Sequence, residues 1–313
     1  MTDWLEIRVQ ADGEAAEAVS ALFNRENARP DGQGGAVTEV SGFDPVGEDH
    51  HPVVTVVTYL LAEAADTAER RRRIEEGLWY LGRIHPLGEV QIRTIADEDW
   101  SNAWKASYRP LRIGRHFLVI PAWLQDEVGL EPGMLPIILD PGMAFGTGLH
   151  PSTQLCLSAM EDLACEGARV LDAGCGSGIL SIAAARLGAR SVAAFDIDPI
   201  AVTATNANAA LNLLPVPIHV RVSSGPRDDA EWASGRQEEM VWDVILVNIL
   251  PHVIVSLLNQ GLADYLAPGG SLLLAGIIEE REPDVLAALA AHGLAPRRRH
   301  RQEDWVALVA GRE

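Results

Sequence analysis

The stretch from Val170 to Leu180, VLDAGCGSGIL, decides how the second half of the chain is expected to fold. A short apolar run leads into three glycines at alternate positions, Gly174, Gly176 and Gly178, and a segment with helical spacing follows. A glycine-rich turn between a strand and a helix lets a ligand come close to the backbone. The stretch therefore predicts a ligand site at the carboxyl end of a buried parallel strand.

The spacing of these glycines favours a ligand smaller than a dinucleotide. Ile179 stands where the pattern G-x-G-x-x-G has its third glycine. Dinucleotide-binding folds use that glycine to pack the helix on the strand and place a pyrophosphate at the helix N-terminus. From the loop alone, other nucleotide ligands and a plain tight turn stay open.

Apolar strands alternate with amphipathic helices from His116 onward, after two short strands. This alternation predicts an α/β, Rossmann-like doubly wound sheet, parallel and buried on both faces. The expected strands are 117–120, 135–139, 168–173, 191–196, 218–222, 243–248, 271–275 and 305–310, and the expected helices are 179–187, 200–211, 252–266 and 284–292.

The front part of the chain has a different order, βαββαβ, which predicts an N-terminal α+β ferredoxin-like sandwich. Its expected strands are 4–10, 36–41, 53–61 and 89–95, and its expected helices are 13–26 and 67–84. A connecting helix is expected over 96–108. We therefore divide the chain into a front domain (1–95), a linker (96–115) and a ligand-binding domain (116–313).

The chain has 313 residues, which is enough for two domains. Its net charge of −19 predicts a strongly acidic surface. Such a surface repels nucleic-acid phosphates and favours basic partners, although the acidity could also serve solubility alone. We expect no stable nucleic-acid binding. We favour a monomer.

The sequence predicts a cytoplasmic protein without a membrane span or a metal site. Its N-terminus lacks the basic and apolar regions of a secretion signal, and no run of about 18 apolar residues occurs. The three cysteines, Cys156, Cys165 and Cys175, are widely spaced and form no C-x-x-C pair. That spacing argues against a disulfide framework and a zinc site, and it fits a reducing compartment.

Two carboxylates follow the second strand of the predicted sheet, in AAFDIDP. Asp196 ends the strand, 22 residues after Gly174, where a carboxylate can accept both ribose hydroxyl protons. Helix capping is the alternative role, but Asp198 stands directly before Pro199 and fits it better. Asp196 and its neighbour Ile197 are therefore candidate ligand contacts.

Asn248 ends the buried strand in VWDVILVNILPH. A neutral amide at this place can accept a hydrogen bond from an amine without holding that amine protonated, as a carboxylate would. The alternative is that Asn248 caps the helix beginning at PHVIVSLL.

The segment DPGMAFGTGLHPSTQLCL, Asp140 to Leu157, predicts a glycine-rich, lid-like loop that runs into a helix. Phe145, Thr147, Ser152 and Thr153 are its candidate ligand contacts. His150 is expected to be structural.

Together these segments, with DWSNAWKASYRPLRIG (99–114), DIDP and VNIL, resemble the bacterial methyltransferases that modify amines of large-subunit ribosomal protein L11, the PrmA family. The likeness covers Asp99 to Leu250. It implies S-adenosyl-L-methionine as methyl donor, a basic ribosomal protein as substrate, and a front domain that recognises that protein. It also implies cofactor contacts at Thr153, Gly174, Asp196 and Asn248.

Two positions depart from the family pattern. Ser152-Thr153 stands for a pair of threonines, and Ser223-Ser224-Gly225 follows the strand 218–222 where many such enzymes carry an acidic residue for adenine. The candidate cofactor contacts are Phe145, Thr147, Ser152, Thr153, Gly174, Gly176, Gly178, Asp196, Ile197 and Asn248, and Asn248 is also the candidate catalytic residue.

Amine methylation requires a neutral amine. A lysine of pKa about 10.4 is neutral about once in 2500 at pH 7, a cost near 4.6 kcal/mol, whereas an α-amine of pKa about 7.8 costs about 1 kcal/mol. An apolar pocket of Phe145, Ile249 and Leu250 would lower the pKa of a lysine.

Three other functions stay open from the sequence: methylation of a non-ribosomal protein, methylation of a small molecule, and cofactor binding without catalysis. A nucleic-acid adenine methyltransferase is disfavoured, because no aromatic residue follows Asn248 to stack a flipped base. A dehydrogenase is disfavoured by Ile179.

Overall fold

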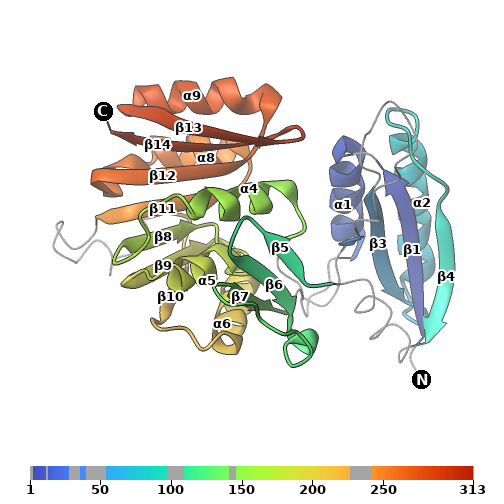
Figure 1. Ribbon diagram of the computed structural model, residues 1–313. Helices are drawn as coiled ribbons and strands as arrows, with labels where there is room; N and C mark the ends of the chain where they lie inside the picture. Colours follow the sequence, from blue (N-terminus) through green and yellow to red (C-terminus); the bar gives the residue numbers. More distant parts are fainter. Residues whose placement is uncertain are drawn as a thin grey trace. The chain divides into compact units, whose positions relative to one another are not determined.

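A computed structural model describes residues 3–11, 13–27, 36–39, 54–96, 109–140, 146–225 and 241–312 (Figure 1). The chain divides into two compact units, Met1–Arg109 and Pro110–Glu313, and each is described by itself. Apart from Ala96, the expected linker helix 96–108 lies outside the described residues.

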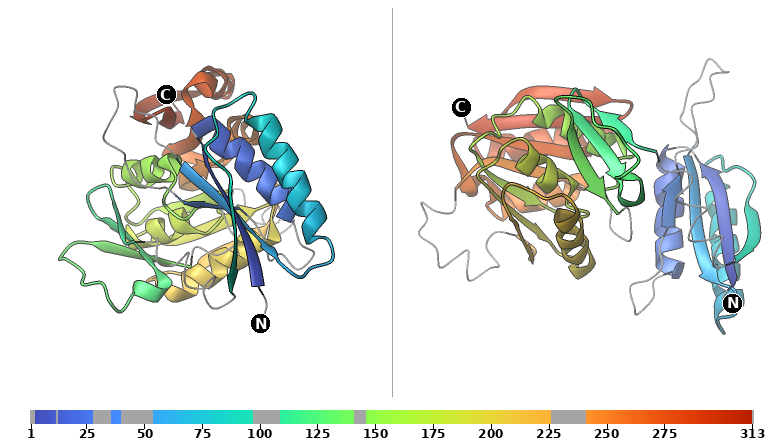
Figure 2. Two further views of the ribbon diagram at one scale, coloured as in Figure 1. Left: turned by 90° about the vertical axis from the view of Figure 1, so that its right-hand side faces the viewer. Right: turned by 60° about the horizontal axis from the view of Figure 1, so that its bottom comes forward.

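The first unit is an antiparallel four-stranded sheet with two helices. Its elements are β1 (Asp3–Ala11), α1 (Gly13–Asn27), β2 (Ala36–Glu39), β3 (Val54–Leu61), α2 (Thr67–Leu81) and β4 (Gln91–Ala96). The strand order is β2-β3-β1-β4. The helices lie side by side (Figure 2) and share a core with the sheet that includes Ile7, Phe23 and Ile74. The βαββαβ order is as predicted, and the ferredoxin-like classification stays a prediction.

The second unit is built on a seven-stranded sheet of order β10-β9-β8-β11-β12-β14-β13. The first five strands in this order run parallel, and β14 and β13 are antiparallel additions at one edge. The strands are β8 (Arg169–Ala173), β9 (Ser191–Asp196), β10 (Ile218–Val222), β11 (Trp242–Asn248), β12 (Leu266–Ile278), β13 (Leu294–Gln302) and β14 (Trp305–Arg312).

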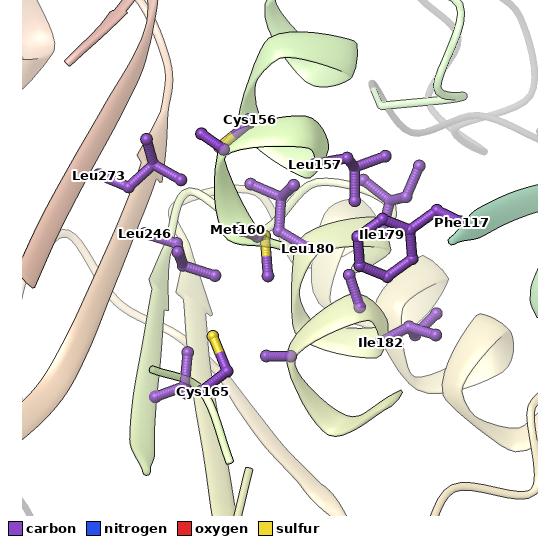
Figure 3. Close-up of a cluster of buried hydrophobic side chains, with 14 of the residues drawn as sticks. Phe117, Cys156, Leu157, Met160, Cys165, Ile179, Leu180, Ile182, Leu246 and Leu273 are labelled. Atoms are coloured by element: carbon purple, nitrogen blue, oxygen red, sulfur yellow. The ribbon is translucent and has the colours of Figure 1, made fainter. Parts of the chain in front are cut away.

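Helices cover both faces of this sheet, which confirms the predicted doubly wound arrangement (Figures 1 and 2). They are α4 (Pro151–Met160), α5 (Ile179–Arg186), α6 (Pro199–Leu211), α8 (Pro251–Asn259) and α9 (Glu282–Ala291). Because successive strand residues point to opposite faces, Leu246 packs with α4 and α5 (Figure 3), whereas Ile245 and Val247 pack with α8 and α9.

A small sheet of β5 (Leu111–Ile113), β6 (Phe117–Pro121) and β7 (Leu135–Leu139) precedes α4. Phe117 and Ile137 are fully buried in the same core as α5 (Figure 3 shows Phe117 there). The sheet is hydrogen-bonded to the end of α6: the Ile138 amide on β7 donates to Oδ1 of Asn212, the C-cap residue of α6, at 2.9 Å.

Three expectations about the elements were wrong. Helix α8 ends at Asn259 instead of 266, because Gly261 adopts φ +92° and a short 3₁₀ turn (Leu262–Tyr265) leads into a longer β12. Strands β5 and β13 were not predicted, and β13 carries the polar run RRRHRQ. The sheet is parallel only from β10 to β12. Within the described ranges, no helix is long and apolar enough to cross a membrane.

Candidate functional site

The predicted site residues come together because β9, β8 and β11 are neighbours in the sheet (Figure 1). Gly174 follows β8, Asp196 ends β9 and Asn248 ends β11. Parallel strands end at the same edge, so these three residues lie along one edge of the sheet.

The glycine loop after β8 is held against β9. Gly174, Gly176 and Gly178 all adopt positive φ, +78°, +54° and +81°. The amides of Gly174 and Cys175 donate to the Phe195 carbonyl at 2.8 and 3.1 Å, which ties the loop to β9.

Asp196 is bound to the glycine loop through its carboxylate. Its Oδ2 accepts from the Gly176 amide at 3.0 Å, and its Oδ1 accepts from the Asp198 amide at 3.0 Å. A carboxylate has about four acceptor positions, so about two stay available to a ligand. Asp198 caps α6 by accepting from the Ile200 amide at 2.8 Å, as predicted. Ile197, between the two carboxylates, is 73% exposed.

The amide of Asn248 is oriented by a hydroxyl on α4. Its Nδ2 donates to Thr153 Oγ1 at 3.2 Å, and its Oδ1 is buried without a hydrogen-bond partner in the described part of the chain. Helix α8 has Leu250 as its N-cap and no side-chain cap bond, so the capping interpretation of Asn248 is wrong. A buried acceptor without a partner costs about 1–3 kcal/mol, and a donor on a ligand would remove that cost.

The loop 146–150 lies against the glycine loop. Ser177 Oγ donates to the Gly146 carbonyl at 2.6 Å, and a methyl group on Gly148 would lie 3.3 Å from Ile179 Cδ1. Thr147 is half-buried in this loop. The preceding candidate, Phe145, is outside the described residues.

Ser152 and Thr153 are buried in the first turn of α4. The Ser152 hydroxyl pairs with His150 Nδ1 at 2.8 Å, whereas the Thr153 hydroxyl faces Asn248. The two hydroxyls therefore serve different partners in this structure.

His150 is the N-cap of α4, as expected of a structural histidine. Its Nδ1 accepts from the Ser152 amide at 3.2 Å, and its ring packs edge-on against Trp305 with centroids 4.5 Å apart. Burial lowers its pKa to about 4, so the ring is neutral at pH 7.

Replacing His150 with asparagine should flatten the dependence of stability on pH. The pKa of His150 falls from 6.5 in the unfolded chain to about 4 in the folded protein, so the stabilising contribution of the neutral ring is present above pH 6.5 and is lost as the pH falls toward 4. Between about pH 7.5 and pH 5, the wild type should lose about 2 kcal/mol more unfolding free energy than His150→Asn, which keeps a capping side chain without this titration. Urea unfolding of both proteins at the two pH values measures this, and parallel losses would contradict it.

Some residues of the site were missed from the sequence. Asp172 on β8 is fully buried; Ser181 Oγ donates to its Oδ2 at 2.6 Å, and its Oδ1 has no hydrogen-bond partner among the described residues. Burial, assisted by the charge of Asp196, raises the pKa of Asp172 to about 7. The only signal in the sequence was a carboxylate inside an otherwise apolar strand.

Helix α6 supports the loops with two buried polar residues that were also missed. Thr205 Oγ1 donates to the Gly176 carbonyl at 3.0 Å. Asn208 Nδ2 donates to the Ser177 carbonyl, and its Oδ1 accepts from the Asp140 amide, both at 2.9 Å. Their positions in the sequence did not predict this burial, because polar residues on a helix usually face solvent.

The chemistry of the site fits a ligand with positive charge and hydroxyl groups. Asp172 and Asn248 each present a buried oxygen without a hydrogen-bond partner in the described ranges, and Asp196 has acceptor positions left. S-adenosylmethionine carries a sulfonium, an ammonium and two ribose hydroxyls, so these acceptors fit it.

Comparison with solved structures gives the class of protein. The chain is similar to the crystal structure of a ribosomal protein L11 methylase from Lactobacillus delbrueckii subsp. bulgaricus, with 33% identity and a TM-score of 0.59 over 66% of this chain and 100% of that one. The fold and the glycine loop define a Rossmann-like, S-adenosylmethionine-dependent methyltransferase.

Comparison with curated sequences gives the family. Proteins named ribosomal protein L11 methyltransferase from Herpetosiphon aurantiacus and Chloroflexus aurantiacus are 44% and 42% identical to the chain, each with 98% of both sequences covered. The family model described as Ribosomal protein L11 methyltransferase (PrmA) matches residues 3–313. The chain belongs to this family. S-adenosylmethionine is its methyl donor.

Proposed function

We propose that this chain transfers methyl groups from S-adenosylmethionine to amines of ribosomal protein L11. The relatives at 42% and 44% identity carry that activity in their names. The structural observation that supports it best is the buried Asn248 Oδ1, which is oriented through Thr153 and has no hydrogen-bond partner in the described part of the chain.

Asn248 accepts a hydrogen bond from the neutral amine and thereby directs the amine lone pair. The cofactor, when bound, supplies an electrophilic methyl group with a neutral thioether as leaving group. The protein mainly has to align the amine, so orientation contributes most of the acceleration. A neutral amide suits this task because it does not stabilise the ammonium form as a carboxylate would.

Ile249 and Leu250 give the amine an apolar wall, for which Phe145 is the third candidate from the sequence. Leu250 is 54% exposed and Ile249 is half-buried, so apolar surface is available directly after Asn248. Such a wall favours neutral lysine by desolvating the ammonium. Both lysine and N-terminal amines are therefore substrates in this proposal.

Asn248 is a candidate cofactor contact as well, and the remaining candidates hold the cofactor. Asp196 accepts from the ribose hydroxyls, and the loop of Gly174, Gly176 and Gly178 lets the ligand approach the backbone. Ile197 offers an exposed apolar surface to the adenine. Contacts to the methionine end are assigned to a set from the lid-like loop and α4: Phe145, Thr147, Ser152 and Thr153.

The front domain, residues 1–95, recognises the substrate protein, and residues 96–115 connect it to the methyltransferase domain over residues 116–313. The net charge of −19 supports a basic ribosomal protein as partner and disfavours stable binding to nucleic acid. The enzyme works as a monomer in the cytoplasm, where ribosomal proteins are made.

Intact-mass measurement on candidate substrates tests the proposal. The total ribosomal protein fraction, transfer RNA and a pool of small amines are incubated separately with the enzyme and S-adenosylmethionine. We expect one basic ribosomal protein to gain mass in methyl increments. A gain only in another protein would discard the substrate, and no gain anywhere, despite cofactor binding, would favour a non-catalytic regulator.

A further inference from the structure

A glycine on β12 lies directly beside the segment that carries Asn248. Gly276 adopts φ +78°, inside an irregularity of the β12–β14 pairing between Leu274 and Ile277. Its neighbour Ala275 pairs with Asn248 in the parallel ladder of β11 and β12. A glycine inside a strand often marks a bulge or the close approach of another backbone.

Here the close approach is to the backbone of Ile249. A methyl group on Gly276 would overlap the Ile249 carbonyl oxygen and would lie 2.9 Å from its carbonyl carbon and 3.0 Å from its amide nitrogen. Gly174 closely approaches the side chain of Ile249, because a methyl group on Gly174 would lie 2.6 Å from Ile249 Cγ2. Ile249 therefore packs closely against Gly276 with its backbone and against Gly174 with its side chain.

We propose that Gly276 is a positioning residue that fixes the backbone after Asn248 and so sets the direction of Asn248 Oδ1. This inference rests on the proposed function. Backbone atoms cannot leave a clash by changing rotamer, so a methyl group at Gly276 has to displace Ile249 itself. Asn248 is covalently next to Ile249, and within the described ranges the one hydrogen bond of its side-chain amide is the 3.2 Å bond to Thr153. The displacement therefore reaches the acceptor oxygen.

Gly276→Ala and Gly269→Ala form a matched pair that tests this role. Gly269 is on the same strand with φ +77°, and a methyl group there would meet nothing within 4 Å. Both positions have a left-handed φ, so the pair compares the same kind of substitution with and without the contact to the Ile249 backbone. A misplacement near 1 Å can cost about 100-fold in rate, so we expect Gly276→Ala to lower kcat for L11 by about 30- to 100-fold. Gly269→Ala should stay within about twofold of the wild type, and S-adenosylhomocysteine affinity should change less than about fivefold in both.

A double-mutant cycle separates positioning from a general structural defect. If Gly276 acts through Asn248, adding Gly276→Ala to Asn248→Ala should lower kcat by less than about threefold. The same loss of kcat in both backgrounds, or equal losses for Gly276→Ala and Gly269→Ala, would overturn the inference. Failure of the wild type to methylate L11 would instead overturn the proposed function.

Ile249→Ala keeps the inference testable if Gly276→Ala does not fold. This variant removes the side-chain contact with Gly174 and retains the backbone contact with Gly276. We expect kcat at saturating L11 to fall by less than about fivefold, with a higher KM for L11. A fall of about 100-fold would show that the side chain, and not Gly276, positions Asn248, and would overturn the inference.

Discussion

Asn248→Ala is expected to lower kcat for L11 by about 10²- to 10³-fold, whereas the affinity for S-adenosylhomocysteine stays within about tenfold. The variant removes the buried Oδ1 that we assign to the amine, and it leaves the glycine loop and Asp196 in place. An interaction that acts mainly on the reacting amine should reduce turnover more than cofactor binding.

Turnover measured by mass spectrometry and cofactor affinity measured by calorimetry test this expectation together. Asn259→Ala is the control, because Asn259 ends α8 at an exposed position and bonds only to His292 among the contacts described for its side chain. The control should keep both parameters within about twofold of the wild type. A large loss of cofactor affinity in Asn248→Ala would show that Asn248 serves the donor instead of the amine.

Asp196→Ala is expected to weaken S-adenosylhomocysteine binding by about 10²- to 10³-fold. A hydrogen bond to a charged group contributes about 1.5–3 kcal/mol, and the ribose offers two hydroxyl donors. The variant also removes the acceptor of the Gly176 amide, so the glycine loop loses one of its hydrogen bonds to β9 and keeps those to the Phe195 carbonyl. Both effects act on the bound cofactor.

Asp198→Ala is the matched control for this second variant. It removes a carboxylate two residues away whose role is to cap α6. Loss of such a cap costs about 1 kcal/mol of stability, so we expect a lower melting temperature and cofactor affinity within about threefold of the wild type. Equal losses of affinity in the two variants would argue against a ribose contact by Asp196.

The doubly wound sheet and the cap of α6 could be predicted from the sequence, because short-range patterns of residues determine both. Apolar strands alternating with amphipathic helices gave the doubly wound sheet, because burial on both faces requires that pattern. Asp198, and not Asp196, was correctly predicted to cap α6, because Pro199 marks the first turn of that helix.

Other features depend on contacts that a local pattern does not carry. Strand β13 is an edge strand whose Arg299 pairs with Glu279 and Glu282, and a run of arginines gives no strand signal. The tight approach of Gly276 to Ile249 exists only after β11 and β12 have paired. Asp172 was missed because its burial depends on the whole sheet.

The structure brings the strand-end candidates to one edge of the sheet, but their roles toward the cofactor and the amine stay predictions. Phe145 and the expected linker helix over residues 97–108 lie outside the described residues, and the described part of the proposed apolar wall consists of Ile249 and Leu250.

The most direct test of the account is the intact mass of purified ribosomal protein L11 after incubation with S-adenosylmethionine and either the wild-type enzyme or Asn248→Ala. We predict that L11 gains mass in methyl increments with the wild type and stays largely unmodified with the variant over the same time. Unchanged L11 with a wild-type enzyme that binds S-adenosylhomocysteine would contradict the substrate, and equal methylation by both enzymes would contradict the role of Asn248.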